Sequence, residues 1–154
     1  MRTDDRTLVI GVGNDFRRDD AVGLRIARRL RDRSDGRLRV AEVSGDVTLL
    51  MELWRPASRV VVVDACAAGG NAGHISHWEG GEVAQAVVRL RGSTHHLGVA
   101  DVITLSQSLH HAPELVDVYG IEGKDFSFGT DLSPEVAQAA ENLSRTLQNL
   151  LLTE

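Results

Sequence analysis

The chain has 154 residues, 42% of them hydrophobic, 25% charged and 4% aromatic, which is enough for one hydrophobic core, so we expect a single domain over residues 1–154. With 17 Lys and Arg against 22 Asp and Glu, the formal net charge is −5, which argues against binding to nucleic acid or to an anionic membrane surface. The apolar runs are too short to span a bilayer, the N-terminal residues lack a signal-peptide pattern, and the one cysteine excludes an intrachain disulfide, so we expect a cytoplasmic protein.

Strands and helices are expected to alternate through the first half of the chain. Hydrophobic periodicity marks each element, and the four valines before Asp64 are typical of a central parallel strand. In chain order, the expected elements are a strand at Leu8–Val12, a helix from Ala21 to about Arg33, a strand at Leu38–Val43, a short helix over 47–54 and a strand at Arg59–Asp64.

The same alternation continues in the second half. The expected elements are a strand at Gly73–Glu79, a segment of ambiguous type at Val83–Leu90, a helix at Val99–Leu109, a strand at Leu115–Ile121 and a last helix that begins at Pro134, after Ser133 as N-cap, with an apolar stripe that runs to Leu151. This order predicts a mostly parallel sheet with helices on both faces. In such a fold, ligands bind at the C-terminal ends of the strands.

The loop between the first strand and the first helix, within Gly11–Gly23, carries two adjacent carboxylates, Asp19 and Asp20. Its glycines do not fit a dinucleotide-binding loop, and negative charge at this helix start repels phosphate and attracts cations. Capping of the helix is one use for such a residue. Because two carboxylates are present, one can cap the helix while the other faces the cleft.

Two further polar residues are expected at the same edge of the sheet. Asp64 follows four buried aliphatic residues, and because burying an unpaired carboxylate is costly, we expect it to emerge at the edge of the sheet. A simple turn aspartate is the alternative interpretation. His95 precedes the helix expected near Gly98, and a histidine there can bind a metal, transfer protons or merely be solvated.

Together, Asp20, Asp64 and His95 offer two oxygen donors and one nitrogen donor. This set suits nickel, zinc or a related divalent ion and leaves coordination positions open. Without a metal, two carboxylates brought close together would act as an acid–base pair. Spacing in the sequence leaves both interpretations open.

Four segments resemble the hydrogenase maturation proteases, the endopeptidases that trim the large subunit of NiFe hydrogenases. They occur in the family's order over nearly the whole chain, at Gly11–Gly23, Val63–Ala65, His95–Asp101 and Tyr119–Val136. The resemblance implies a three-layer α-β-α fold with a twisted, mostly parallel sheet of five strands between helices.

The resemblance also implies an aspartic-type, nickel-dependent endopeptidase. Such an enzyme removes the C-terminal extension of a NiFe hydrogenase large-subunit precursor after nickel has been inserted. The nickel belongs to the substrate, and the family's metal-contacting residues map onto Asp20, Asp64 and His95, where zinc or cadmium could replace it. We expect a monomer that binds this precursor transiently, because no apolar stripe is evident beyond those that the core needs.

One segment departs from the family's pattern. After the second strand the family usually has an Asp-Gly-Gly-Thr turn, whereas Ser44–Thr48 here reads SGDVT, with Asp46 displaced by one position and Gly45 and Thr48 keeping part of the turn. This departure leaves the contact with the substrate's C-terminal segment open. Glu122 and Asp125 are additional acids that could line the cleft.

Two rival interpretations use the same edge of the sheet. Cys66 could be a nucleophile with His95 as its base, although a lone cysteine is more often a small buried hydrophobe. Alternatively, the chain is a non-catalytic chaperone that holds nickel or the precursor through the same three ligands. The mass of the precursor separates a protease from a chaperone, because a protease shortens it.

Overall fold

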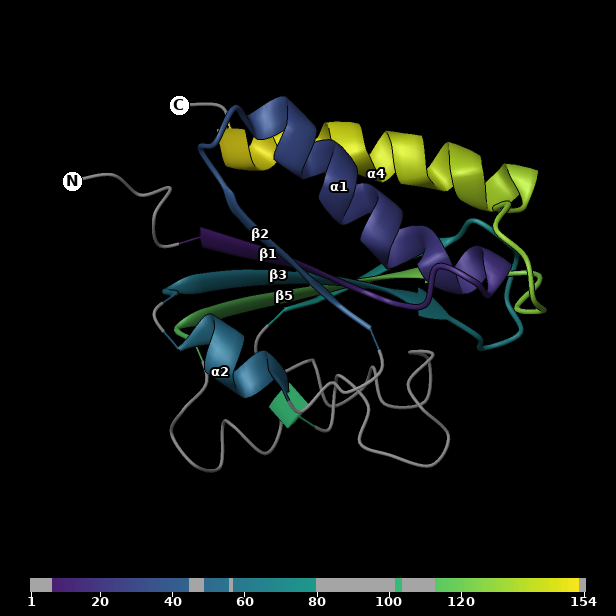
Figure 1. Ribbon diagram of the computed structural model, residues 1–154, viewed down its shortest axis with the longest axis horizontal. Coiled ribbons are helices and arrows are strands. Elements are labelled where there is room, and N and C mark those ends of the chain that lie inside the picture. The colour runs from purple at the N-terminus through teal and green to yellow at the C-terminus, as the bar shows by residue number, and fades with distance from the viewer. Residues whose placement is uncertain (1–6, 45–48, 56, 80–101, 104–112, 153–154) are drawn as a thin grey trace.

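The computed structural model describes residues 7–44, 49–55, 57–79, 102–103 and 113–152, in which five strands form one sheet with helices on both faces (Figure 1). The order of the strands in the sheet is β2-β1-β3-β5-β4. β4 runs antiparallel at one edge, and the other four strands are parallel, so the predicted mostly parallel sheet is confirmed. The strands are β1 (Thr7–Val12), β2 (Arg39–Val43), β3 (Arg59–Cys66), β4 (Ile75–Glu79) and β5 (Leu115–Glu122).

Two long helices cover one face of the sheet, and a short helix lies on the other (Figure 1). The long helices are α1 (Val22–Ser34), which follows the one-turn 3-10 helix η2 (Arg18–Ala21), and α4 (Pro134–Leu152); the short helix is α2 (Leu50–Trp54). Val102 and Ile103 are also helical and buried, while the rest of the predicted Val99–Leu109 helix, residues 47–48 and the Val83–Leu90 segment lie outside the described residues. Among the helices that are described, none has the length and apolarity needed to cross a membrane.

The core consists of two apolar clusters, one on each face of the sheet, because side chains alternate between the faces of a strand. In β3, for example, Val61 and Val63 join the cluster under α1 and α4, whereas Val60 and Val62 join the cluster on the other face. All four valines are fully buried, as a central strand covered on both faces requires. Helix α1 contributes the predicted stripe, in which Val22, Ile26, Ala27 and Leu30 are buried.

Among the differences from the sequence prediction, two boundaries and one buried position are informative. β3 extends two residues beyond Asp64, because its pairing with β5 continues to Cys66 opposite Glu122. β4 begins at Ile75 rather than Gly73, since Gly73 has a φ of 89° in the turn before the strand. Leu150, expected in the apolar stripe of the last helix, is 50% exposed, whereas Leu151 and Leu152 pack against the cluster under α1 and α4.

Candidate functional site

Close backbone packing fixes the loop between β1 and α1 against the sheet. A Cβ atom at Gly13 would collide with the carbonyl oxygen of Asp20, and the Asn14 N–H donates to that same carbonyl over 3.2 Å. A Cβ atom at Gly23 would collide with the carbonyl oxygen of Val63. The glycines therefore let the start of α1 lie directly on the end of β3, which brings the backbones of Asp20 and Asp64 to the same edge of the sheet.

The two carboxylates at this edge differ in their exposure. Asp20, in η2, is partly exposed. Asp64 is only 1% exposed, and its Oδ1 accepts the N–H of Ala65 over 2.8 Å. The expectation that Asp64 emerges from the core is thus wrong: β3 continues to Cys66, so Asp64 lies within the strand and not after it.

Of the three predicted site residues, the structure brings Asp20 and Asp64 to one edge. His95, the predicted nitrogen donor, lies outside the described residues. The same holds for Gly45, Asp46 and Thr48 of the turn that departs from the family's pattern. The two described residues supply carboxylate oxygens, which are ligands for divalent cations.

Asp19 has a structural role in this loop. It is fully buried, and its carboxylate accepts hydrogen bonds from the backbone N–H groups of Lys124 (2.8 Å), Asp125 (2.9 Å) and Ser133 (2.7 Å). The Ser133 hydroxyl donates to it as well, over 2.8 Å. Asp19 therefore ties η2 to the loop between β5 and α4, which fixes the position of the residue that follows it.

The prediction that Asp19 or Asp20 caps α1 is not met, because the N-cap residue of α1 is Ala21 and makes no side-chain cap hydrogen bond. Asp19 instead binds the residue before α4, Ser133, whose carbonyl accepts the Ala137 N–H over 2.8 Å. The Asp–Asp doublet in the sequence allowed one of the two acids to have a structural role. The sequence could not show the contacts of Asp19, because its partners lie more than 100 residues away along the chain.

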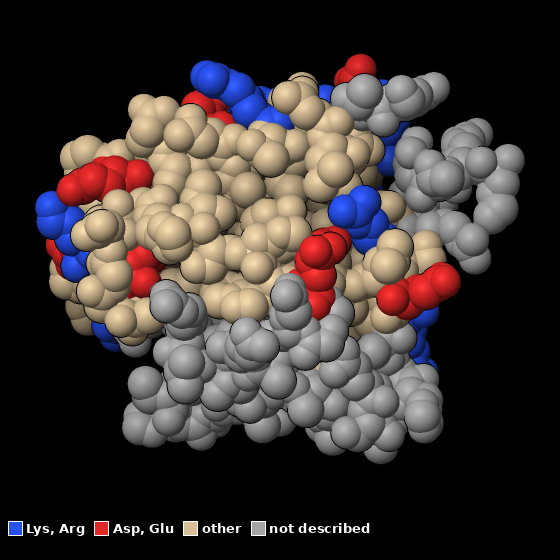
Figure 2. All heavy atoms as spheres, turned by 180° about the vertical axis from the view of Figure 1, so that it is seen from behind, with Lys and Arg blue, Asp and Glu red and all other residues tan. Residues whose placement is uncertain are grey.

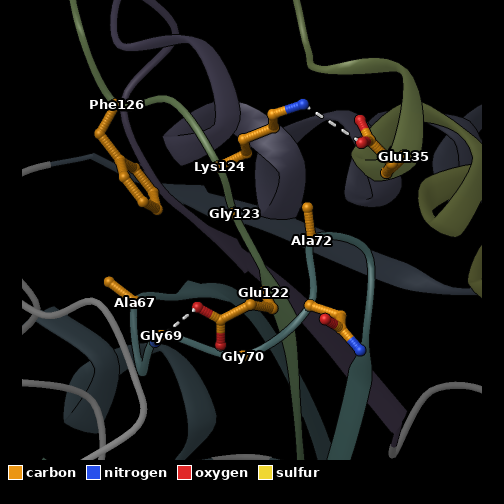
Figure 3. A pocket seen from close by; sticks show the side chains of 10 residues that line it. Ala67, Gly69, Gly70, Ala72, Glu122, Gly123, Lys124, Phe126 and Glu135 are labelled. Carbon is orange, nitrogen blue, oxygen red and sulfur yellow. Dashed lines mark hydrogen bonds and ion pairs between the residues drawn. The ribbon is translucent and has the colours of Figure 1, made fainter.

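A cavity of about 500 Å³ opens beside this edge, between the segment that follows β3 and the segment that follows β5 (Figure 3). Glu122 forms its floor, is only 4% exposed, and accepts the N–H groups of Ala68 (3.0 Å) and Gly69 (3.1 Å) through Oε2. Glu122 thus lines this cavity, but Asp20 and Asp64 do not, so a place for Glu122 in the predicted metal-binding cleft stays a prediction. Asp125 does not line this cavity, and its carboxylate accepts hydrogen bonds from the backbone and hydroxyl of Ser127 instead.

The rim of the cavity carries an ion pair, in which Lys124 Nζ lies 3.3 Å from Glu135 Oε2 (Figure 3). The pKa of Glu135 is lowered, first by its own backbone N–H at the start of α4 and then by Lys124. The pKa of Asp125 is lowered by the two hydrogen bonds from Ser127. Both groups are therefore negatively charged at neutral pH.

Cys66 lies at the end of β3, two residues after Asp64. It is 2% exposed and packs in the apolar cluster on the α2 face of the sheet. This placement is that of a small buried hydrophobe, which matches the alternative weighed against a nucleophilic role.

On the face shown in Figure 2, basic and acidic side chains of the described residues lie in small mixed groups, with no continuous basic surface.

Comparisons with known proteins place this fold and this edge in context. The family model described as "Hydrogenase maturation protease" matches residues 27–149, a span that includes Asp64 and His95, while the Asp19–Asp20 loop precedes it. The hydrogenase expression/formation protein HupD of Thiocapsa roseopersicina is 26% identical over 141 residues, 90% of this chain. The match covers 64% of that protein, so this chain spans less than two thirds of the relative's length.

Two solved structures have the same fold. The NiFe hydrogenase maturation protease HybD from Thermococcus kodakarensis superposes with a TM-score of 0.78 and 26% identity, covering 95% of this chain and 99% of that one. The hydrogenase maturating endopeptidase HybD from E. coli gives a TM-score of 0.82 at 22% identity, covering 95% of this chain and 91% of that one. The second likeness shows the fold alone, and it bears out the predicted α/β architecture.

Proposed function

The chain belongs to the hydrogenase maturation protease family, and from this premise we propose that it is an endopeptidase that cuts the C-terminal extension from a NiFe hydrogenase large-subunit precursor after nickel insertion. The family match over residues 27–149 is the observation that carries this proposal. We further propose that the enzyme works as a cytoplasmic monomer, with the precursor as its protein partner.

The arrangement at the carboxyl edge of the sheet supports the proposal. Parallel α/β sheets bind ligands at this edge, and the packing of Gly23 on Val63 carries Asp20 to it. Asp64 lies within the central strand, where its buried carboxylate accepts the Ala65 N–H and is held in a fixed position. The cavity floored by Glu122 provides adjoining space for a peptide segment.

In this proposal the nickel is cargo of the substrate, and the protease recognises it through oxygen and nitrogen donors. Asp20, Asp64 and His95 contact the loaded metal centre, and zinc or cadmium can replace nickel there. One of the two carboxylates accepts a proton from the attacking water as general base while the peptide bond is cut. Correct positioning of the scissile bond contributes much of the rate, because orientation alone is worth several kcal/mol.

Incubation of the purified protein with nickel-loaded and nickel-free precursor tests this function. We expect the mass of the loaded precursor to fall by that of its C-terminal extension and the mass of the nickel-free precursor to stay unchanged. Asp20→Asn and His95→Ala should each lose cleavage activity, because each variant lacks a metal-contacting group. Asp32→Asn, an exposed aspartate of α1, is the matched control and should cleave normally.

Each contrary result has a defined meaning. An unchanged mass of the loaded precursor would identify a chaperone that binds without cutting. Equal cleavage of both precursors would remove metal recognition, and full activity of Asp20→Asn would remove the site assignment. Loss of cleavage in a folded Cys66→Ser variant would support the thiol mechanism instead.

A further inference from the structure

A second group of potential metal ligands lies on the opposite face of the sheet from Asp64. Within the described residues, His77, Glu79 and Asp117 each offer a ligand atom, and these atoms lie within 4.8 Å of one another. In the register of the sheet, Asp117 pairs with Val61, which belongs to the cluster under α1 and α4. Asp64 follows Val62 by two residues and therefore shares its face, which is the opposite one. The group is therefore separate from the carboxylates at the carboxyl edge.

We propose that His77, Glu79 and Asp117 bind one divalent transition ion of the Zn²⁺ type. One nitrogen and two carboxylate oxygens make a donor set that suits such an ion, and a fourth position stays open to water. The antiparallel register of β4 and β5 creates the group, because it places Glu79 opposite Asp117 and His77 opposite Tyr119 on one face. Residues two apart in a strand share a face, so His77 and Glu79 of β4 lie on the same face as Asp117 and Tyr119 of β5.

The geometry is already close to that of a bound ion. His77 Nε2 lies 2.8 Å from Asp117 Oδ1, and two ligands of a tetrahedral zinc ion lie roughly 3.3 Å apart. The ion would take the place of the hydrogen between this nitrogen and this oxygen, and Nδ1 of the neutral imidazole would then carry the N–H. Glu79 is exposed, so rotation of its side chain can bring its carboxylate to the same ion.

Neighbouring side chains hold two of the ligands in place. The imidazole of His77 stacks on the ring of Tyr119, with 4.2 Å between centroids and an angle of 2° between planes. Arg59 Nε and Nη2 both donate to Asp117 Oδ2 over 3.3 Å, which leaves Oδ1 directed at His77. Such contacts from neighbouring residues orient metal ligands. The carboxylates of Glu79 and Asp117 together with the Arg59 guanidinium still carry a net charge of −1.

The burial of the group suits an ion that enters from solvent and is then held. The Asp117 side chain is 9% exposed and anchors the site, whereas that of His77 is 37% exposed. The two strands each contribute ligands, so a bound ion would clamp the edge strand β4 to β5. We therefore expect the ion to stabilise the folded protein, because it binds the folded chain in preference to the unfolded one.

Calorimetric titration of the full chain with zinc chloride tests the proposal. An Asp20→Asn, Asp64→Asn double variant serves as background, so that binding at the carboxyl edge is removed. We expect this background to bind about one equivalent of zinc, with a rise in melting temperature. His77→Gln should weaken this binding at least about tenfold and abolish the rise, since a ligand is lost.

His74→Gln is the matched control, since His74 is exposed, lies three residues away and is not one of the three ligands. It should keep the zinc affinity of the background. Absence of saturable zinc binding in the background, or equal affinities in His77→Gln and His74→Gln, would overturn the proposal. His77→Gln in the otherwise unchanged chain should cleave the precursor normally, so the result is independent of the proposed function.

Discussion

Two acidic regions of this molecule stabilise their carboxylates by different means. At the carboxyl edge of the sheet, Asp19 and Glu122 are buried and accept mainly backbone N–H groups. On the outer side of α1, Asp15 and Glu42 share the guanidinium of Arg28, at distances of 2.7 Å to each carboxylate. The carboxylates of the first region are thus stabilised by the fixed dipoles of backbone N–H groups, and those of the second region by the positive charge of a flexible arginine side chain.

The difference has a functional consequence. Backbone N–H groups stabilise a carboxylate but do not cancel its negative charge, so the carboxyl edge keeps a field that attracts cations. An arginine cancels that charge, and the pair is weakened by salt and by protonation. This retained charge is compatible with the proposed recognition of a metal-loaded substrate.

The largest effect that tests this comparison is expected at Asp19. Asp19→Ala leaves three backbone N–H groups and a hydroxyl without their acceptor, so we expect a loss of about 3–5 kcal/mol in the free energy of unfolding. Urea denaturation measures this loss. Because backbone donors carry no net charge, the loss should change little between low and high salt.

Asp32→Ala, at an exposed position of α1, is the matched control and should leave stability nearly unchanged. A loss at Asp19 of less than about 1 kcal/mol would show that water readily replaces the carboxylate. In that case the backbone contacts would not fix the loop that carries Asp20.

A smaller loss of stability is expected at Arg28, and unlike the loss at Asp19 it should depend on salt and pH. Arg28→Met should cost roughly 1 kcal/mol at neutral pH, since the paired side chains are partly exposed and screened by solvent. Hydrogen bonds from Arg28 lower the pKa of both Asp15 and Glu42. Their contribution is therefore complete above the ordinary carboxyl pKa near 4 and is lost as the pH falls through the lower folded values.

Denaturation of the wild type and the Arg28→Met variant across pH and salt measures this. The difference between them should shrink below about pH 4 and in high salt. Arg145→Met serves as control, because that arginine is 67% exposed and pairs with Glu141 only at the surface. A difference that stays constant with pH would mean that Arg28 acts through packing rather than charge.

The smallest effect is expected at Tyr119, the one tyrosine of the chain. Its pKa is raised above the ordinary value near 10, first by burial, then by the Asp117 carboxylate and, more weakly, by Glu79. Glu79→Gln should lower this pKa slightly, as followed by the ultraviolet absorbance of tyrosinate. Glu52→Gln, an exposed change on α2, should leave it unchanged, and an equal shift in both variants would rule out a local field.

Much of the fold could be predicted from the sequence because burial leaves a periodic trace. The valines before Asp64 identified the central strand, and the stripe of α1 identified its buried face. For the site, the sequence pointed to Asp20 and Asp64, whose backbones the packing of Gly23 on Val63 brings to one edge, while their role as site residues stays a prediction. His95 stays a prediction, because it lies outside the described residues.

By itself, then, the sequence determined the order of strands and helices and the family, since both depend on residues close together along the chain. Only the tertiary structure decided which acid is structural, because the partners of Asp19 lie 105 to 114 residues away. It also decided that Asp64 is buried, since pairing with β5 extends β3 beyond it. The physical reason is that hydrogen bonds between distant segments depend on register, and periodicity in one segment carries no information about its partner.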